Sequence, residues 1–305
     1  MAVTKTIPLL LLLALGTFGL SPSALAWGDA GHRIVAALAF RELPPAAQKH
    51  LHEILQAHPE YAQWRAAWTR EGGDVDLGLY LFMRAAAWPD EIRRRGGPYD
   101  HPHWHFIDYP LRAPKFPVTP PPSREEDILH GLAEAERALA ARSTPPEARA
   151  AYLSWLIHLV GDLHQPLHCG ELVSAEFPHG DKGGNVFWVK PGARAIKLHA
   201  LWDGLLGTPG HARGEINAAV RLAAEYPTAS LKSAARERSP NKWSLESRRL
   251  AIEKVYLSGK LRGGTNEESA IPLPAGYAKT GQAVAERQAA VAGARLAAEI
   301  KTWVR

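Results

Sequence analysis

Sulfur is scarce in this chain, which contains one cysteine and two methionines among its 305 residues. The single cysteine, Cys169, excludes an intrachain disulfide and any zinc site that requires two thiolates. No Asn-x-Ser/Thr sequence is present, so N-glycosylation does not contribute to stability. Histidine and tryptophan, in contrast, are plentiful, with 14 and 10 residues. A metal site in this protein must therefore be built mainly from imidazole and carboxylate groups.

Neither sign of charge dominates, because 36 Lys and Arg face 31 Asp and Glu and give a formal net charge of +5. That excess is compatible with an anionic substrate but is too small to indicate nucleic acid by itself. The hydrophobic content of 46% and charged content of 22% are typical of a soluble globular protein and exclude wholesale disorder. Internal repeats and low-complexity linkers are also missing, which favours one domain over two.

Long apolar runs are confined to the first 26 residues. Lys5 precedes an almost wholly apolar run over 7–20, and Ala24-Leu25-Ala26 has the small-x-small pattern of a cleavage site. A membrane anchor is the alternative, but the run is shorter than the roughly 20 residues that span a bilayer. We therefore expect a secretory signal peptide over 1–26 that is cleaved after Ala26, and a secreted or periplasmic mature chain without a membrane insertion.

Most of the remaining chain has the pattern of helices. The expected helices are Gly31–Leu43, Pro45–Ala57, Arg124–Arg142, Pro146–His164, Gly214–Glu225, Ser244–Ser258 and Tyr277–Val304. Ser123, with Glu126 three residues later, is the predicted N-cap of the third. The fourth is apolar on several faces, which predicts a helix buried at the centre of the domain.

Two loop-rich segments interrupt the predicted helices. They are Gly96–Pro122, which contains eight prolines, and His179–Lys197, in which Asn185–Val189 is expected to form a short hairpin strand. The sequence therefore predicts an all-α protein, with a single mainly helical domain over residues 27–305 that has long loops and at most a short hairpin.

The most informative motif is His158-x3-Asp162 within the predicted central helix. Residues four apart leave the same face of a helix, so both side chains can reach one metal ion. Their neighbours are apolar, and an unpaired carboxylate would be costly in such surroundings. A buried His–Asp ion pair with a purely structural role is the alternative for this motif taken alone.

The same spacing recurs at His199-x3-Asp203, and His168 lies between the two pairs. Two such pairs with a further histidine are difficult to explain as separate core ion pairs. Zinc sites built from imidazole and carboxylate are usually catalytic, because they keep an open position for water. Two adjacent metals are the arrangement used for in-line displacement at phosphorus.

A third group of candidates is Asp90, Arg93 and His105. Asp90 is expected to stand before a helical turn and His105 to lie in an aromatic, strand-like run. Arg93 would follow Asp90 by one turn, where it could meet a phosphate oxygen. Each has an ordinary alternative: an aspartate after proline is usually an N-cap, a lone histidine is usually packed in a core, and an arginine in the run Arg93–Arg95 is usually solvated.

With these motifs in order, the chain resembles the zinc-dependent, single-strand-specific nucleases of the mung-bean-nuclease type, which share a fold with bacterial zinc phospholipases C. The resemblance covers nearly the whole mature chain. It rests on Trp27-Gly28, Gly31-His32, Trp88-x-Asp90, His105-Phe106-x-Asp108, His158-x3-Asp162, Gln165-Pro166-Leu167-His168, Asp181-x-Gly183-Gly184-Asn185 and His199-x3-Asp203, followed by Trp243, Glu246-Ser247, Val255-Tyr256 and Ala292-Gly293-x-Arg295-Leu296-Ala297.

The resemblance implies a site for three zinc ions. The first would be held by Asp90, His105, His158 and Asp162, the second by His168, His199 and Asp203, and the third by Asp162 as a shared bridge, His32, and the free amine and carbonyl oxygen of Trp27. The amine of Trp27 becomes available only after the peptide bond that precedes it has been cut. Cleavage of the signal peptide would then be a condition for metal binding.

The resemblance also implies the roles of other residues. A metal-activated hydroxide would attack phosphorus with the help of Asp90, and Arg93 would stabilise the charge of the pentacoordinate phosphate. Phe106 would stack on a nucleobase, Asp108 would accept its hydrogen bonds, and Asn185 would bind substrate. A base can be stacked in this way only when it is free of a duplex, which favours single strands.

This chain departs from the pattern in having no possible internal disulfide, although many members of that family carry them. Its loops Pro110–Pro122 and Gly170–His179 are individual to it and could border the substrate groove. His101, His103 and His164 lie near the motifs, but we expect them to lie behind the ligands or at the surface and not to be ligands themselves.

The function predicted from the sequence is that of an exported, monomeric zinc endonuclease. It would hydrolyse single-stranded DNA and RNA to 5′-phosphorylated products and act as a 3′-nucleotidase on nucleotides, without a stable protein partner. A zinc phospholipase C and a non-catalytic, metal-stabilised binding protein of the cell envelope are the alternatives.

Overall fold

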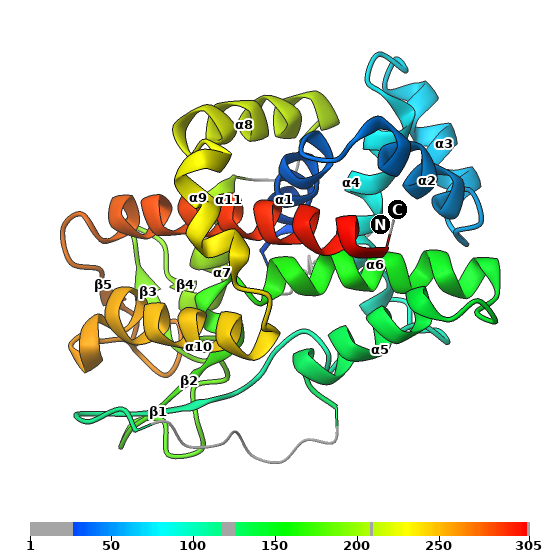
Figure 1. Cartoon of the computed structure of the whole chain (residues 1–305). Helices are drawn as coiled ribbons and strands as arrows, with labels where there is room; N and C mark the ends of the chain where they lie inside the picture. The colour runs from blue at the N-terminus through cyan, green and yellow to red at the C-terminus, as the bar shows by residue number, and fades with distance from the viewer. Residues whose placement is uncertain (1–26, 118–125, 208–209, 304–305) are drawn as a thin grey trace, which may run out of the picture.

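Four helices pack against one another at the centre of the protein in a computed structural model that describes residues 27–117, 126–207 and 210–303 (Figure 1). They are α1 (Asp29–Arg41), α4 (Leu77–Arg93), α6 (Pro146–Asp162) and α11 (Tyr277–Trp303). Helix α11 crosses the molecule in front of α1 in this view, and α1 also contacts α4 and α6. The expected signal peptide, residues 1–26, lies outside the described residues.

Helix α6 is buried over its entire second half. Every residue from Leu153 to Asp162 is buried, and the helix contacts α1, α4, α5 and α11. This accounts for apolar residues on all of its faces and confirms the prediction of a central, buried helix. The last buried positions of α6 are also the ones that carry the His158-x3-Asp162 motif, so the motif lies inside the core.

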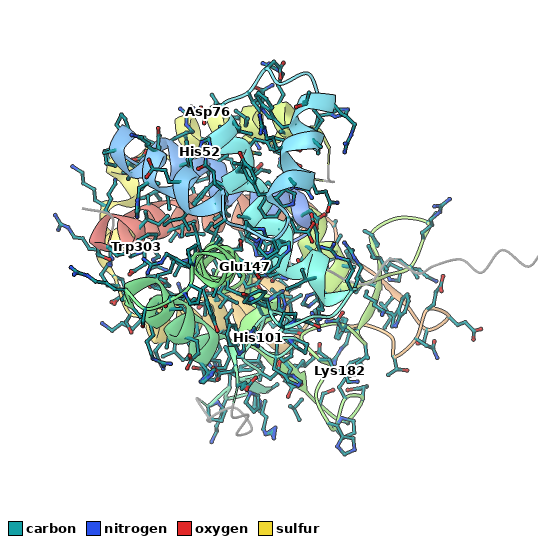
Figure 2. The ribbon with its side chains drawn as sticks, turned by 90° about the vertical axis from the view of Figure 1, so that its right-hand side faces the viewer. His52, Asp76, His101, Glu147, Lys182 and Trp303 are labelled. Carbon is teal, nitrogen blue, oxygen red and sulfur yellow. The ribbon has the colours of Figure 1, made fainter. Side chains whose placement is uncertain are left out.

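Shorter helices cover the central four. They are α2 (Pro45–Leu55), α3 (Tyr61–Arg70), α5 (Ile128–Ala140), α7 (Leu198–Asp203), α8 (Ala212–Glu225), α9 (Thr228–Arg236) and α10 (Pro240–Leu250). His52 of α2 and Asp76, whose carboxylate accepts a hydrogen bond from Leu79 N at 2.8 Å and caps α4, lie at the same end of the protein (Figure 2). Within the described part of the chain, no helix is both long and apolar enough to cross a membrane.

Among the described residues, five short strands form two small sheets. Strand β1 (Pro110–Arg112) pairs in parallel with β2 (Glu171–Val173), while β3 (Trp188–Lys190) pairs with both β4 (Ile196–Lys197) and β5 (Ile271–Pro272). The predicted hairpin is therefore present as β3–β4, shifted by a few residues and extended by a third strand. The mainly helical, single-domain fold predicted from the sequence is confirmed.

Several boundaries differ from the sequence prediction. The predicted cap Ser123 lies outside the described residues, and α5 begins instead at Ile128, where Asp127 accepts hydrogen bonds from the backbone of Leu129 and His130 at 2.9 and 3.0 Å. The helix expected over Ser244–Ser258 starts earlier, at Pro240, with Ser239 as its N-cap. It passes into a π-helical turn over Ala251–Val255 and ends there, and Leu257 and Ser258 just beyond have positive φ angles of 50° and 56°.

Four of the described α-helices were not predicted: α3, α4, the six-residue α7 and α9. Helix α4 is buried on several faces and contains Pro89, so its sequence has no clear 3.6-residue period and includes a residue that normally ends helices. Asp90 therefore lies in the last turn of a long helix and not before a helical turn. His105 lies in a turn and not in a strand. Helices α3 and α9 are short and each buries one side chain, Trp64 and Leu231, which leaves too weak a pattern to detect.

His58 is a buried, neutral base that packs between Trp64 of α3 and Trp88 of α4. It is 3% exposed, its ring stacks on Trp64 with the centroids 4.2 Å apart, and the edge of Trp88 lies 4.5 Å away. Its Nδ1 accepts a hydrogen bond from Glu60 N at 3.0 Å. Burial lowers the pKa of His58 to about 3, because no carboxylate compensates for the lost hydration of the imidazolium.

We expect His58 to make the protein less stable as the pH falls. The unfolded chain binds a proton near pH 6.5 and the folded chain only near pH 3, so the stabilisation is complete above pH 6.5 and is lost progressively below it. His58→Phe should reduce the slope of the unfolding free energy between pH 6 and 4 by about 1.4 kcal/mol per pH unit, measured by urea unfolding. Parallel curves for the two proteins would show that His58 is not the titrating group.

Candidate metal centre

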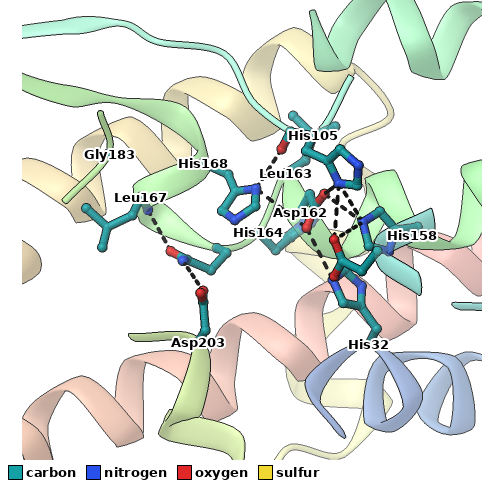
Figure 3. A network of polar contacts seen from close by, with 12 residues as sticks. His32, His105, His158, Asp162, Leu163, His164, Leu167, His168, Gly183 and Asp203 are labelled. Carbon is teal, nitrogen blue, oxygen red and sulfur yellow. Dashed lines mark hydrogen bonds and ion pairs between the residues drawn. The ribbon is translucent and has the colours of Figure 1, made fainter. Parts of the chain in front are cut away.

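Side chains from six separate segments converge at the end of α6. His32 comes from α1, Asp90 from the last turn of α4, His105 from the loop that follows, His158 and Asp162 from α6, His168 from the 3₁₀ turn Pro166–Cys169, and His199 and Asp203 from α7. All eight are at most 7% exposed. Figure 3 shows most of this network, with Asp162 between His168 on one side and His32, His105 and His158 on the other.

Asp162 is shared by two groups of imidazoles. Its Oδ2 lies 3.0 Å from His158 Nε2 and 3.3 Å from His105 Nδ1, while its Oδ1 lies 3.3 Å from His32 Nε2 and 3.5 Å from His168 Nδ1. The two oxygens of one carboxylate therefore face different partners. That is the geometry required of a carboxylate that bridges two metal ions.

Asp90 is the second carboxylate that lies close to His105, His158 and His32. Its Oδ1 lies 3.6 Å from His105 Nδ1 and 3.9 Å from His158 Nε2, and its Oδ2 lies 3.9 Å from His32 Nε2. The donor atoms of two sets, His32–His158–Asp162 and Asp90–His105–His158, each lie within 4.8 Å of one another. Such spacings suit ligands placed around a common ion.

His168, His199 and Asp203 form a third set of donors within 4.8 Å of one another. His199 Nε2 lies 3.5 Å from Asp203 Oδ2, and the rings of His168 and His199 have centroids 5.0 Å apart. Gln165 supports this set at two points, because its Nε2 donates to Asp203 Oδ1 at 2.8 Å and its Oε1 accepts from Leu167 N at 2.6 Å. One amide thus orients a candidate ligand and fixes the turn that carries another.

Backbone carbonyls fix three of the rings. The Nδ1–H of His158 donates to Ala86 O at 2.8 Å, that of His168 to His105 O at 2.6 Å, and that of His199 to Gly183 O at 2.6 Å. Each bond sets the tautomer with the proton on Nδ1 and leaves the Nε2 lone pair directed at the cluster, as metal ligation requires.

Many donor atoms of the cluster have no hydrogen-bond partner within the described residues. They are both oxygens of Asp90, Oδ1 of Asp162, Oδ2 of Asp203, both ring nitrogens of His32 and Nε2 of His168. Burial of so many unsatisfied polar atoms is costly, and cations bound among them remove that cost. The donor set, which is imidazole and carboxylate without sulfur, suits zinc and leaves room for water or substrate. The clusters can therefore hold metal ions.

The electrostatics of the site are those of a cation-binding centre. Burial lowers the pKa of His32 to about 4 and those of His105 and His199 to about 3, so these imidazoles are neutral at ordinary pH and able to act as ligands. Burial raises the pKa of Asp90 to about 7 and that of Asp203 well above its usual range. Two carboxyl groups that resist ionisation in the bare protein are the ones that a divalent cation would stabilise as carboxylates.

His158 and Asp162 behave as an ion pair in the bare protein. Although burial acts in the opposite direction on each, the carboxylates of Asp162 and Asp90 raise the pKa of His158 to about 9. The charges of His158 and His168 hold the pKa of Asp162 well below its usual range. A proton on His158 thus occupies the position of a cation between two carboxylates.

Two glycines allow the rings to approach. A Cβ on Gly161 would lie 2.8 Å from His32 Nδ1, and the His32 ring stacks on His158 with centroids 3.9 Å apart. Gly183 has a φ of 58°, and a Cβ there would lie 2.5 Å from Leu167 O. Glycine at 183 therefore places the carbonyl that holds His199, and glycine at 161 makes room for His32.

Trp27 is the first described residue and is buried near Asp203, a member of the His168–His199–Asp203 set. It is 2% exposed, its side chain packs over Gly31, and the following residue, Gly28, donates from its N–H to Asp203 O at 3.2 Å. The backbone at Trp27 therefore runs beside Asp203.

Arg93 is exposed at the end of α4, in the same turn as Asp90. Its positive charge adds to the effect of burial in lowering the pKa values of His105, His168 and His199. The guanidinium therefore lies within electrostatic range of these three histidines, at the solvent side of the site.

The three residues expected to bind substrate, Phe106, Asp108 and Asn185, are half-buried near these groups. Phe106 follows His105, and the ring of His103 meets it edge-on with centroids 6.4 Å apart. Asp108 lies two residues further along. Asn185 Nδ2 donates to Lys182 O at 3.0 Å, within the turn that contains Gly183.

A family profile matches the part of the chain that carries these donor sets. The S1/P1 nuclease profile matches residues 27–305, which begins at Trp27 and includes every residue of the three donor sets. The chain belongs to the S1/P1 nuclease family. The resemblance in the sequence is thereby confirmed at the level of the family.

Individual members of the S1/P1 nuclease family are distant relatives of this chain. Endonuclease 4 and endonuclease 3 of Arabidopsis thaliana are 26% and 27% identical over 204 and 197 residues, and each match covers 60% of this chain. Nuclease S1 of Aspergillus oryzae is 26% identical over 206 residues, or 64% of this chain. The matched segments span 56%, 55% and 60% of the lengths of these three relatives.

The sequence alone indicated no role for three residues that support the site in this S1/P1 nuclease family member: Gln165, Gly161 and Gly183. Gln165 stood in a quoted motif, but nothing in its spacing indicates a bond to Asp203, which is 38 residues away. The glycines act by the side chain that they lack. His164, which was expected not to be a ligand, uses both ring nitrogens elsewhere: Nδ1 donates to Val160 O at 2.7 Å and Nε2 accepts from Arg295 at 2.9 Å.

Gln165→Leu should weaken the site formed by His168, His199 and Asp203. The substitution removes both hydrogen bonds of the amide while keeping a similar volume, and the loss of such an outer-shell partner typically costs 10- to 100-fold in metal affinity, roughly. Competitive metal titration followed by calorimetry measures the change. Gln282→Leu, on the exposed side of α11, is the matched control and should leave every affinity unchanged; equal effects would argue against a positioning role for Gln165.

Proposed function

We propose that this protein is an exported zinc-dependent endonuclease that hydrolyses the phosphodiester bonds of single-stranded DNA and RNA to 5′-phosphorylated products. It also acts as a 3′-nucleotidase. The observation that carries the proposal is the carboxylate of Asp162, which faces imidazoles on both of its oxygens and joins neighbouring donor sets beside Arg93. Membership of the S1/P1 nuclease family supports the same reaction class.

The proposed ligands divide into three zinc sites. Asp90, His105, His158 and Asp162 hold the first; His168, His199 and Asp203 hold the second; Asp162, His32 and the amine and carbonyl oxygen of Trp27 hold the third. His158 belongs geometrically to both sets that contain Asp162 or Asp90, so the first and third sites are neighbours. The lack of sulfur among the donors supports zinc sites of the open, catalytic kind.

Zinc bound in these sites would lower the pKa of a coordinated water molecule and neutralise charge on the phosphate. The protein residues supply the rest. Asp90 accepts a proton from the attacking water on a carboxylate oxygen, and the exposed Arg93 donates hydrogen bonds to the non-bridging phosphate oxygens, whose charge grows in the transition state.

Base recognition falls to the half-buried residues beside the site. Phe106 provides a ring face for stacking, Asp108 accepts hydrogen bonds from the amino and imino groups of the base, and the side chain of Asn185 binds the sugar–phosphate. Stacking on Phe106 requires a base that has left its duplex, and this requirement supports a preference for single strands.

Export follows in this proposal from a signal peptide over residues 1–26, with the catalytic domain over 27–305. Removal of the peptide exposes the amine of Trp27, which then chelates together with its own carbonyl oxygen. We infer that the mature enzyme works as a monomer, because all proposed ligands come from one chain.

The decisive experiment combines metal analysis with activity assays on protein that begins at Trp27. We expect three zinc ions per chain, release of 5′-phosphorylated products from single-stranded DNA and RNA, and much slower cleavage of duplexes. Hydrolysis of phosphatidylcholine without release of nucleotides would identify a phospholipase C instead. Zinc-loaded protein that cleaves neither substrate would identify a binding protein.

Asp162→Asn should disturb two metals, whereas Asp203→Asn should disturb one. The reason is that the two oxygens of Asp162 face different donor sets, while Asp203 belongs to a single set. Activity should fall more than about 100-fold in both, since even outer-shell partners of metals are worth 10- to 100-fold. Zinc analysis by mass spectrometry under non-denaturing conditions provides the counts, and equal losses in both variants would exclude the bridge.

Protein that keeps one extra residue before Trp27 should lose the third zinc ion and most of its activity. The added residue turns the amine into an amide, which no longer ligates, and its bulk must be placed where Trp27 is buried. Digestion with an aminopeptidase that stops at Trp27 should restore both properties. Full zinc content and turnover in the extended protein would refute the role of the terminal amine.

A further inference from the structure

The turn over residues 181–185 follows a left-handed path. Lys182, Gly183 and Gly184 have φ angles of 55°, 58° and 82°, a region that residues other than glycine rarely adopt. The turn presents two carbonyl oxygens to one proposed zinc ligand, His199. Gly183 O accepts from the His199 ring at 2.6 Å, and Gly184 O accepts from the His199 N–H at 3.2 Å. The turn thus fixes both the backbone and the ring of His199, and its strained path has to be stabilised by other contacts.

The carboxylate of Asp181 supplies those contacts from the start of the turn. It is 0% exposed, and its Oδ1 accepts from Leu172 N of strand β2 at 2.9 Å. Asp181 N donates back to Leu172 O at 3.0 Å, while Oδ2 accepts from the hydroxyl of Tyr256 at 2.6 Å. The N–H of Gly184, within the turn, also donates to this carboxylate. One side chain therefore joins the turn to a strand, to a core tyrosine and to its own far end.

Hydrogen bonds favour the ionised form of this buried group. Burial raises the pKa of Asp181 to about 6, whereas the Tyr256 hydroxyl and the N–H groups of Leu172 and Gly184 act in the opposite direction. Hydrogen bonds to an ionised acceptor are roughly twice as strong as those between neutral groups. The carboxylate is thus suited to hold backbone that would otherwise leave the left-handed path.

Tyr256 supports the turn from the side of the core. It is 0% exposed and ends the π-helical turn over Ala251–Val255. Its ring meets that of Phe187 edge-on, with the centroids 5.9 Å apart. Phe187 in turn donates from its N–H to Gly184 O at 3.3 Å and accepts at its carbonyl from Leu198 N at 2.8 Å. Tyr256 therefore touches the turn by a hydrogen bond and, through packing, the chain that leads into α7.

We propose that Asp181 and Tyr256 are positioning residues for the second zinc site, to which His199 belongs. They act through the turn, because its Gly183 carbonyl (Figure 3) sets the tautomer and the direction of the His199 ring. The inference rests on the proposed function, in which this donor set holds zinc, and adds to it two side chains that are not ligands. Both belong to sequence motifs of the family resemblance to which the ligand set gives no role.

Zinc titration of Asp181→Ala, followed by mass spectrometry under non-denaturing conditions, tests the inference. The affinity for the second zinc should fall by roughly 10- to 100-fold, the loss typical of an outer-shell partner, while the other two sites keep theirs. Asp181→Asn should restore most of the affinity, because the amide oxygen still accepts from the backbone and the Tyr256 hydroxyl can accept from the amide N–H. Tyr256→Phe, which removes one hydrogen bond and keeps the packing, should give a smaller loss. A uniform loss at all three sites, or unchanged affinities, would overturn the inference.

Tyr80→Phe is the matched control for Tyr256→Phe. Tyr80 is also buried, and its hydroxyl also donates to a carboxylate, that of Glu71 at 2.9 Å. Glu71 lies at the end of α3 and belongs to none of the three donor sets. The two substitutions remove the same kind of bond, so only Tyr256→Phe should weaken zinc binding. Equal losses of affinity would show a general effect of lower stability and would contradict a positioning role for Tyr256.

The ring of His199 gives a readout that does not depend on nuclease activity. In the wild-type protein as purified, with or without zinc, ¹⁵N NMR of labelled histidine should show the Nδ1–H tautomer with slow exchange of that proton. Asp181→Ala should mix the tautomers and speed the exchange, because the Gly183 carbonyl is no longer fixed. A wild type that binds no zinc, or cleaves no nucleic acid, would be a failure of the proposed function alone. An unchanged Nδ1–H signal in Asp181→Ala would overturn the present inference in either case.

Discussion

A carboxylate buried without access to water, such as that of Asp162, needs positive charge near both of its oxygens. His158, which carries a proton in the bare protein, supplies that charge at one oxygen, and the imidazoles of His32, His105 and His168 surround the carboxylate from three further segments of the chain. Helix α6 sets the position of Asp162 and His158 in the core, and α1, the loop after α4 and the 3₁₀ turn after α6 bring the other histidines to them. The central helices thus have to satisfy a packing requirement and a charge requirement at the same point.

The rest of the site shows how little of the precision comes from the ligands themselves. Rings are oriented by backbone carbonyls, Asp203 by the amide of Gln165, and His32 by the missing side chain of Gly161. These supports belong to segments far from the residue they hold. A metal centre assembled in this way is as stable as the contacts between helices, because displacement of one element moves ligands and supports together.

The sequence was sufficient to predict the helical class, the central helix and the convergence of two His-x3-Asp pairs, because helical spacing is a local property. It was insufficient for α4, whose burial on several faces hides its period and whose Pro89 is typical of a helix end. Asp90 was accordingly placed beside the wrong element. Contacts between distant segments, such as that of Gln165 with Asp203, have no local signature.

The carbonyl oxygens of Ala86, His105 and Gly183 carry a further consequence for how such a centre evolves. Every residue type presents the same carbonyl, so replacement of the side chain at 86 leaves the atom that holds His158 untouched, provided that the new side chain fits. The functional constraint at these positions therefore acts on the position of the main chain and not on the type of residue. Distant relatives can carry different residues at such positions, and so lose sequence similarity there, while the imidazole rings keep the same orientation.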